Sequence, residues 1–195
     1  YCDLVFAPSS QEIYQNNIQS QAFSFEGLEH QMEGKFRAGH FDGVGTIVKR
    51  LFDIVKPQKA YFGEKDFQQL QIIRSMVKSF KIPVKIVGCE IYREEDGLAM
   101  SSRNARLTNE HRNAAPFIFK TLKEAKLKIG TNNALEIIDW VKAEFIKQPL
   151  LELEYFEIAD EDSLISIDIM KPKQKYRAFI AVFAGKIRLI DNISL

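Results

Sequence analysis

The sequence lacks the features that mark several large classes of protein. Its 195 residues contain two cysteines, Cys2 and Cys89, and no C-x-x-C pair. Two thiols in a chain of this length do not build a disulfide framework, so we expect reduced, partly buried thiols, as in a cytoplasmic protein. No apolar run approaches the roughly 18 residues of a membrane span, so we expect no membrane segment. The sequence also has no G-x-S-x-G, no Walker loop and no full dinucleotide fingerprint.

An excess of charge of one sign is missing too. Lys and Arg number 27 against 26 Asp and Glu, so the net charge is +1 and gives no reason to expect a nucleic-acid partner. His30, His40 and His111 have no spacing typical of a metal site, so we predict no metal ligands in this chain. With 46% hydrophobic and 27% charged residues, the composition is typical of a soluble globular protein.

The chain begins at Tyr1, without Met, and runs directly into an apolar stretch. Residues 3–6 have the character of a buried strand, and Pro8 follows as a turn. No targeting segment precedes this stretch, so we expect the chain to start within a domain, as a fragment.

Residues 1–91 show the pattern of an α/β domain. The expected elements are, in order, a helix to Tyr14 capped by Ser9 or Ser10, an edge strand at 21–25, a helix at 39–55, a strand at 60–62, a helix from Asp66 and a strand at 84–89. The last three elements form a β-α-β unit, which implies a parallel sheet.

Residues 92–195 show a different pattern, which predicts a second, small α+β domain. The expected elements are a polar loop around 96–104, a helix from Thr108 to about Lys128 closed by Gly130, a helix at 133–147, a strand at 151–158 and a hairpin of 176–183 and 186–190. Helices followed by antiparallel strands favour a separate domain, so we place the boundary near residue 91.

Residues Gly63-Glu64-Lys65-Asp66 stand where an α/β sheet usually binds ligands, just past the carboxyl end of a strand. Gly63 permits close approach of a ligand, and the following helix offers free N–H groups that suit phosphate. Lys65 adds a positive charge, Asp66 can cap the helix or accept from ribose hydroxyls, and Gln69 lies on the same helix face. The alternative is a capped helix with a solvated Lys65 and Glu64, which spacing alone favours.

Two further segments suit an anionic ligand. Met100-Ser101-Ser102-Arg103-Asn104 combines hydroxyl groups with a guanidinium in a polar loop, which suits phosphate oxygens, although an ordinary surface loop is the alternative. Arg37 and His40 precede a helix, where they can meet an anion. On that helix, Val44, Ile47 and Val48 form an apolar face that belongs to the core and can also line a substrate pocket.

Four segments, in consistent order and spacing, resemble the pantothenate synthetase (pantoate–β-alanine ligase) family. They are Arg37-Ala-Gly-His-Phe-Asp-Gly-Val44, Phe62-Gly-Glu-Lys-Asp-Phe-Gln-Gln-Leu70, Asp96-Gly-Leu-Ala-Met-Ser-Ser-Arg-Asn104 and Arg188-Leu-Ile-Asp-Asn192. The likeness extends from Tyr1 to the C-terminus. Four matches are far more specific than one, and they favour the functional interpretation of Lys65 and Arg103.

The resemblance implies a partial Rossmann-like nucleotidyltransferase domain with a parallel sheet, followed by a small α+β lid domain. It also implies a cytoplasmic homodimer that uses ATP with Mg²⁺. In the reaction it implies, the carboxylate of pantoate attacks the α-phosphate of ATP and gives pantoyl adenylate and pyrophosphate. The amine of β-alanine then attacks this mixed anhydride and releases AMP.

The resemblance also implies roles for individual residues. The residues with implied catalytic roles are Lys65, Ser101, Ser102 and Arg103. The residues implied to contact ATP are Gly63, Glu64, Lys65, Asp66, Tyr92, Met100, Ser101, Ser102 and Arg103, with Tyr92 acting through its backbone. The residues implied to contact pantoate are Gln69, Val44, Ile47, Val48, His40 and Arg37.

The family also carries a His-x-Gly-His motif, a second pantoate-binding Gln and acidic residues on the magnesium side, which this chain lacks. We therefore expect the chain alone to have no useful ligase activity. Two alternatives stay open: another nucleotidyltransferase with a similar loop, such as a tRNA synthetase or cytidylyltransferase, and a stand-alone nucleotide-binding or interaction module.

Overall fold

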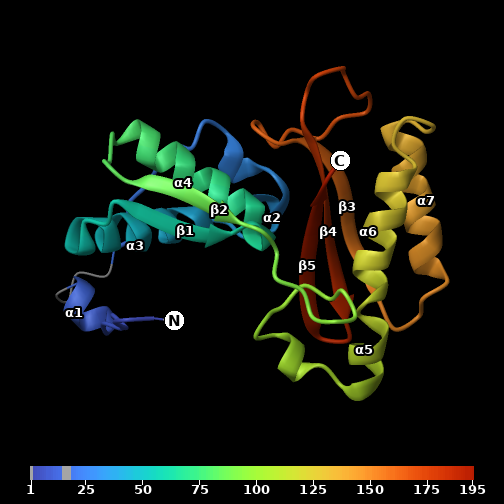
Figure 1. Cartoon of the computed structure of the whole chain (residues 1–195), viewed down its shortest axis with the longest axis horizontal. Coiled ribbons are helices and arrows are strands. Elements are labelled where there is room, and N and C mark those ends of the chain that lie inside the picture. Colours follow the sequence, from blue (N-terminus) through green and yellow to red (C-terminus); the bar gives the residue numbers. More distant parts are fainter. Residues whose placement is uncertain (1, 15–18) are drawn as a thin grey trace.

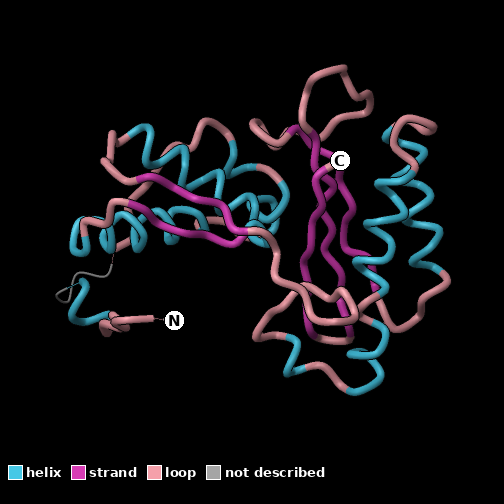
Figure 2. Tube along the Cα trace, in the orientation of Figure 1, coloured by secondary structure: helices cyan, strands magenta, loops and turns pink. Residues whose placement is uncertain are grey.

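Two groups of secondary structure lie side by side in the computed structural model, which describes residues 2–14 and 19–195 (Figure 1). We call them the N-terminal unit and the C-terminal unit. Their sheets are separate: one has two strands, and the other has three in the order β3-β4-β5 (Figure 2). None of the helices in the described residues combines the length and the apolarity needed to cross a membrane.

The N-terminal unit is built on a parallel pair of strands, β1 (Lys59–Gly63) and β2 (Lys85–Cys89). Helix α4 (Phe67–Ser79) connects them and packs against α3 (His40–Val55). Two shorter helices, α1 (Ser10–Tyr14) and α2 (Met32–Phe36), precede α3. The predicted β-α-β unit with a parallel sheet is therefore confirmed.

The C-terminal unit is an antiparallel sheet with helices on one face (Figure 1). Its strands are β3 (Glu152–Asp160), β4 (Tyr176–Ala184) and β5 (Ile187–Ser194), and its helices are α5 (Asn109–Ala114), α6 (Phe117–Leu127) and α7 (Ala134–Ile146). The middle strand β4 is buried along almost its whole length, and α6 and α7 share its core. The predicted helices-then-strands order and the predicted hairpin are confirmed.

The predicted helix from Thr108 to Lys128 is wrong in one respect, because it is divided into two helices, α5 and α6. Pro116 precedes the first residue of α6, and proline has no N–H to donate to the carbonyl four residues earlier. The helix start at Thr108 is confirmed, since its hydroxyl accepts from the His111 N–H at 3.3 Å.

Two predicted strands are wrong. Residues 3–6 form no strand in the structure, and Leu4 and Val5 are 82% and 79% exposed, because no described strand lies beside them to accept their hydrogen bonds. Residues 21–25 also form no strand. The N–H groups of Gln21 and Phe23 donate instead to side chains of α3, at 2.9 and 3.0 Å. The expectation of partly buried thiols is likewise wrong, since Cys2 and Cys89 are both exposed.

The two units share apolar contacts. The core of the N-terminal unit includes Ala159, Leu164 and Phe179 from the C-terminal unit. The rings of Phe67 and Phe179 lie 6.0 Å apart across this contact. The position of the boundary near residue 91 stays a prediction, but the contact places the first turn of α4 directly against the second sheet.

Candidate active site

A cavity of about 210 Å³ lies where the two units meet. Its walls come from four parts of the chain: the segment around α2, the start of α4, the loop after residue 100 and the sheet of the C-terminal unit. The lining residues are Met32, Glu33, Arg37, His40, Phe41, Lys65, Asp66, Phe67, Gln68, Gln69, Ser101, Arg103, Tyr155, Phe179, Ile180, Ile190, Asp191 and Asn192.

The structure brings seven of the predicted site residues to this cavity. They are Arg37, His40, Lys65, Asp66, Gln69, Ser101 and Arg103. The predicted residues outside the described lining are Gly63, Glu64, Tyr92, Met100, Ser102, Val44, Ile47 and Val48. Tyr92 and Met100 are 72% and 53% exposed, whereas Val44 and Val48 pack against the core of the N-terminal unit. The roles of these residues stay predictions.

The end of β1 positions Lys65. The strand ends at Gly63, one short turn of 3₁₀ helix covers Glu64–Asp66, and α4 begins at Phe67. Glu64 is half-buried, and its carboxylate accepts from Arg177 Nη2 at 3.4 Å. Among the described residues, Asp66 makes no side-chain cap to α4. Lys65 lines the cavity from this turn, directly before α4.

The loop after β2 positions Arg103. Its guanidinium donates from Nη1 to the Arg188 carbonyl at 3.0 Å, and its backbone N–H donates to Ser101 Oγ at 3.2 Å. Asn104 holds the base of the loop. Its amide donates to the Glu94 carboxylate at 2.6 Å and to the Ala99 carbonyl at 3.1 Å. A loop held this firmly at its base can present Ser101 and Arg103 in a defined place.

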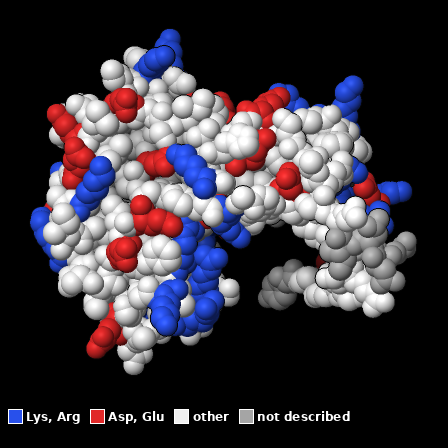
Figure 3. Space-filling view, turned by 180° about the vertical axis from the view of Figure 1, so that it is seen from behind, with Lys and Arg blue, Asp and Glu red and all other residues white. Residues whose placement is uncertain are grey.

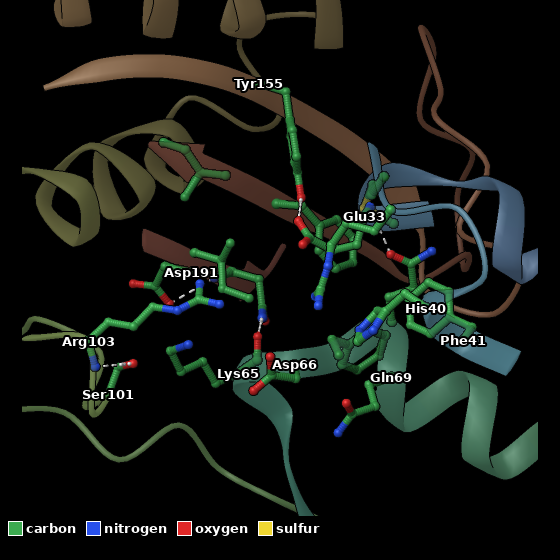
Figure 4. A pocket seen from close by; sticks show the side chains of 18 residues that line it. Glu33, His40, Phe41, Lys65, Asp66, Gln69, Ser101, Arg103, Tyr155 and Asp191 are labelled. Carbon is green, nitrogen blue, oxygen red and sulfur yellow. Dashed lines mark hydrogen bonds between the residues drawn. The ribbon is translucent and has the colours of Figure 1, made fainter. Parts of the chain in front are cut away.

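The cavity has two chemically different ends. Figure 4 shows Lys65, Ser101 and Arg103 together at one end and His40 with Gln69 at the other. Within residues 2–14 and 19–195, neither Lys65 nor Arg103 forms a salt bridge. Two cations without a carboxylate partner, one from each unit, suit a ligand with several negative charges.

The distribution of charged side chains on the surface agrees with a cationic end of the cavity near Arg103. The loop of residues 92–107 and α5 lie at the lower end of the C-terminal unit (Figure 1). Seen from behind, Lys and Arg side chains gather on the lower part of that unit, whereas both signs are intermixed over the remaining surface in view (Figure 3). In this view the basic side chains therefore gather over the same end of the unit as the loop that carries Arg103.

His40 begins α3, directly after Gly39, whose φ is +72°. Burial lowers the pKa of His40, and the Arg37 charge lowers it further, although Glu33 and Asp66 oppose both effects. The imidazole is therefore neutral at neutral pH, with one nitrogen as a donor and the other as an acceptor. A neutral ring suits hydrogen bonding to hydroxyl groups better than charge pairing.

Glu33 is a cavity residue that no sequence pattern indicated. Its carboxylate accepts two hydrogen bonds from Arg188 and one, at 2.8 Å, from the Tyr155 hydroxyl. Burial raises the pKa of Glu33, but the hydrogen bonds and charge of Arg188 outweigh this effect, and the pKa lies below its ordinary value. Burial raises the pKa of Tyr155 strongly, so its hydroxyl stays protonated. The buried Gln68 accepts from the Glu33 N–H at 3.0 Å and so fixes the segment that carries it.

Asp191 and Asn192 also line the cavity, and the sequence predicts no individual role for either residue. Asp191 accepts two hydrogen bonds from Arg93, at 2.7 and 3.0 Å, and burial raises the pKa of its carboxyl. The signal available in the sequence was two polar residues inside an apolar strand, Leu189 to Ile193, which calls for buried partners.

The lining residues do not fit a Mg²⁺ site. In the part of the chain that the structure describes, no group of three or more His, Cys, Asp and Glu is arranged to hold a metal ion. Of the three carboxylates at the cavity, those of Glu33 and Asp191 each form a salt bridge with an arginine. We therefore assign no metal ligand among the described residues.

The sequence model described as Pantoate-beta-alanine ligase matches residues 1–194. The chain belongs to the pantoate-beta-alanine ligase family. It is similar to the pantothenate synthetase of Flavobacterium psychrophilum, with 56% identity over 98% of this chain and 68% of that protein. It is also similar to the pantothenate synthetase of Bacteroides fragilis, with 49% identity over 96% of this chain and 66% of that protein. The chain thus spans about two thirds of the length of these curated relatives.

Two solved structures of the pantoate-beta-alanine ligase family resemble the fold. The pantothenate synthetase of Thermus thermophilus matches with a TM-score of 0.90 and 37% identity, over 98% of this chain and 69% of that one. The pantoate-beta-alanine ligase of Francisella tularensis, described as a complex with beta-gamma ATP and beta-alanine, matches with a TM-score of 0.72 and 32% identity, over 96% and 62%. The predicted fold class and the resemblance are therefore confirmed. The tRNA synthetase, cytidylyltransferase and stand-alone module alternatives are not supported.

Proposed function

We propose that this chain carries one wall of the active site of an ATP-dependent pantoate–β-alanine ligase. The observation that carries this proposal is the meeting of Lys65 from the N-terminal unit and Arg103 from the C-terminal unit at one end of the cavity. The family of the chain supplies the reaction. Pantoate's carboxylate oxygen attacks the α-phosphorus of ATP and pyrophosphate leaves. The β-alanine nitrogen then attacks the carbonyl carbon of pantoyl adenylate, loses a proton and displaces AMP.

ATP takes the end of the cavity that holds the cations. Lys65, Ser101 and Arg103 contact its phosphates and stabilise the charge that builds on pyrophosphate as the phosphorus–oxygen bond breaks. The turn from Gly63 to Asp66 approaches the ribose. We propose that Ser102 and Met100, which are exposed beside this end, also contact the nucleotide, and that Tyr92 contacts adenosine through its backbone. Residues 2–14 and 19–195 contain no ligand set for Mg²⁺, so the phosphates of ATP themselves would hold the ion.

Pantoate takes the other end of the cavity. Gln69 and the neutral imidazole of His40 offer hydrogen bonds to its hydroxyl groups, and Arg37 offers a charge to its carboxylate. The face of Val44, Ile47 and Val48 is proposed to pack on its methyl groups, although these residues lie outside the described lining. The homodimer and the cytoplasmic location remain predictions from the resemblance.

The first experiment measures ATP–pyrophosphate exchange by the complete gene product. We expect exchange that depends on pantoate, followed by AMP release once β-alanine is added. Exchange that requires an amino acid in place of pantoate contradicts the proposal and favours another adenylating enzyme.

The second experiment measures AMP release by the 195-residue chain alone. The chain contains no His-x-Gly-His motif, so we expect no useful turnover from it. Turnover by this chain at the rate of the complete gene product contradicts the idea that the cavity residues described above form only part of the site.

A further inference from the structure

Asn192 of β5 reaches across the contact between the two units to the turn that carries Lys65. The residue is 2% exposed, and its Nδ2 donates to the Glu64 carbonyl at 2.9 Å and to the Lys65 carbonyl at 3.0 Å. Both donor hydrogens of one amide are thus used on two successive carbonyls of the other unit. These carbonyls belong to a one-turn 3₁₀ segment that leads directly into α4.

Arg177 fixes which way the Asn192 amide faces. The Arg177 guanidinium is buried and donates from Nη1 to Asn192 Oδ1 at 2.7 Å. It also donates to Glu161 at 2.9 Å and to Glu64 at 3.4 Å, and it lies 3.9 Å from the centre of the Phe67 ring. Because a guanidinium has no acceptor, the amide oxygen must face Arg177 and the amide nitrogen must face the turn.

These contacts form a chain of defined geometry from β4 and β5 to the backbone of Lys65. The direction of a side chain follows from the backbone dihedral angles of its residue and from the rotamers that they allow. We propose that Asn192 is a positioning residue for Lys65: it holds the Glu64–Lys65 carbonyls so that the ammonium group meets the phosphates. This inference rests on the proposed function, because it assumes that Lys65 contacts phosphate.

The same interface contains a matched control. Gln71 of α4 also donates from its amide to a backbone carbonyl of the other unit, that of Glu161. Its side chain does not belong to the described lining of the cavity. A substitution at Gln71 therefore removes an amide-to-carbonyl bond between the units without touching the Lys65 turn.

The test compares Asn192→Ala, Asn192→Asp and Gln71→Ala in the complete gene product. Asn192→Asp keeps the size of the side chain and its acceptor for Arg177, but it turns a carboxylate oxygen toward two carbonyls. We expect both Asn192 variants to lower the maximal rate of pantoate-dependent exchange about 10- to 100-fold, as a misplaced catalytic group does, with the KM for pantoate unchanged. Gln71→Ala keeps the wild-type rate.

A double-variant cycle separates positioning from general damage. In a Lys65→Ala background, Asn192→Ala should lower the rate no further, because the group that it positions is already gone. The proposal is overturned if the two losses multiply, if both Asn192 variants keep the wild-type rate, if Gln71→Ala is equally slow, or if the lost rate only follows lost folded protein measured by thermal unfolding. A different result, in which wild type shows no pantoate-dependent exchange or Lys65→Ala is fully active, overturns the proposed function instead.

Discussion

Arg188 of β5 donates two hydrogen bonds to the carboxylate of Glu33 at α2, from Nη1 at 2.8 Å and from Nη2 at 2.7 Å. The two residues are 155 positions apart in the chain, and they connect the two units beside the cavity that Glu33 lines. Arg188 also donates from Nε to Glu154 at 2.7 Å. One guanidinium thus serves two carboxylates, and only one of them lies in its own unit.

Replacing Arg188 should weaken the folded protein. Arg188→Ala leaves the carboxylates of Glu33 and Glu154 partly buried without their cation, which costs about 3 kcal/mol of unfolding free energy. Urea unfolding measures this loss. Lys142→Ala is the control, because its ion pair with Asp139 is exposed and contributes at most about 0.5 kcal/mol. Equal midpoints for the two variants would show that the Arg188 contact does not hold the units together.

The stability contributed by Glu33 should depend on pH in a known direction. Its pKa in the folded protein lies below the ordinary 4.5, so the charged form is favoured by folding. The contribution is complete above pH 4.5 and is lost as the pH falls through the lower folded value. Glu33→Gln should therefore be less stable than wild type at neutral pH, and the gap should narrow below pH 4.5. A gap that stays constant from neutral to acidic pH would mean that Glu33 does not contribute through its charge.

Removing either cation should slow the chemical step. In the complete gene product, Lys65→Ala and Arg103→Ala should each lower kcat about 100-fold, as expected when one preorganised charge contact is lost. Pantoate-dependent pyrophosphate exchange is the measurement. Arg106→Ala is the control, since Arg106 is an exposed arginine of the same loop outside the described lining of the cavity. Unchanged rates in both cation variants would refute the phosphate roles.

The loop that carries Arg103 depends on Gly97. Its φ is +92°, and a Cβ at this position would lie 2.8 Å from Cδ1 of Phe119. Gly97→Ala should therefore destabilise the protein by more than about 1 kcal/mol. Gly43→Ala is the matched control, because a Cβ there meets nothing within 4 Å and Ala favours a helix by about 0.5–1 kcal/mol. Thermal unfolding of both variants should show shifts of opposite sign.

The parts of the fold that the sequence could predict are those with local signals. Asn133 and Glu136 form a capping box that starts α7 where the sequence placed a helix, and Gly63 ends β1 as predicted. Lys65, Asp66 and Gln69 reach the cavity because the end of β1 and the start of α4 bring them there.

The rest of the site depends on contacts between distant residues. Glu33 meets Arg188 and Tyr155, and Asn192 meets the Lys65 turn, across sequence separations of more than a hundred residues. No sequence pattern around Glu33 indicates a functional role, because a glutamate on the surface and a glutamate between two units have the same local sequence signal. The prediction of a strand at residues 3–6 was wrong for a related reason. A strand needs a neighbouring strand for its hydrogen bonds, and a local sequence pattern does not show whether one is present.

The contact between Arg103 and the Arg188 carbonyl has a consequence for affinity. Among the described residues, the contact uses one of the five N–H groups of the guanidinium and leaves the others for a phosphate. It also holds the side chain in place before a ligand arrives, which reduces the conformational entropy that binding must remove. A polyphosphate gains more from this arrangement than a single small anion, because it engages Lys65 at the same time.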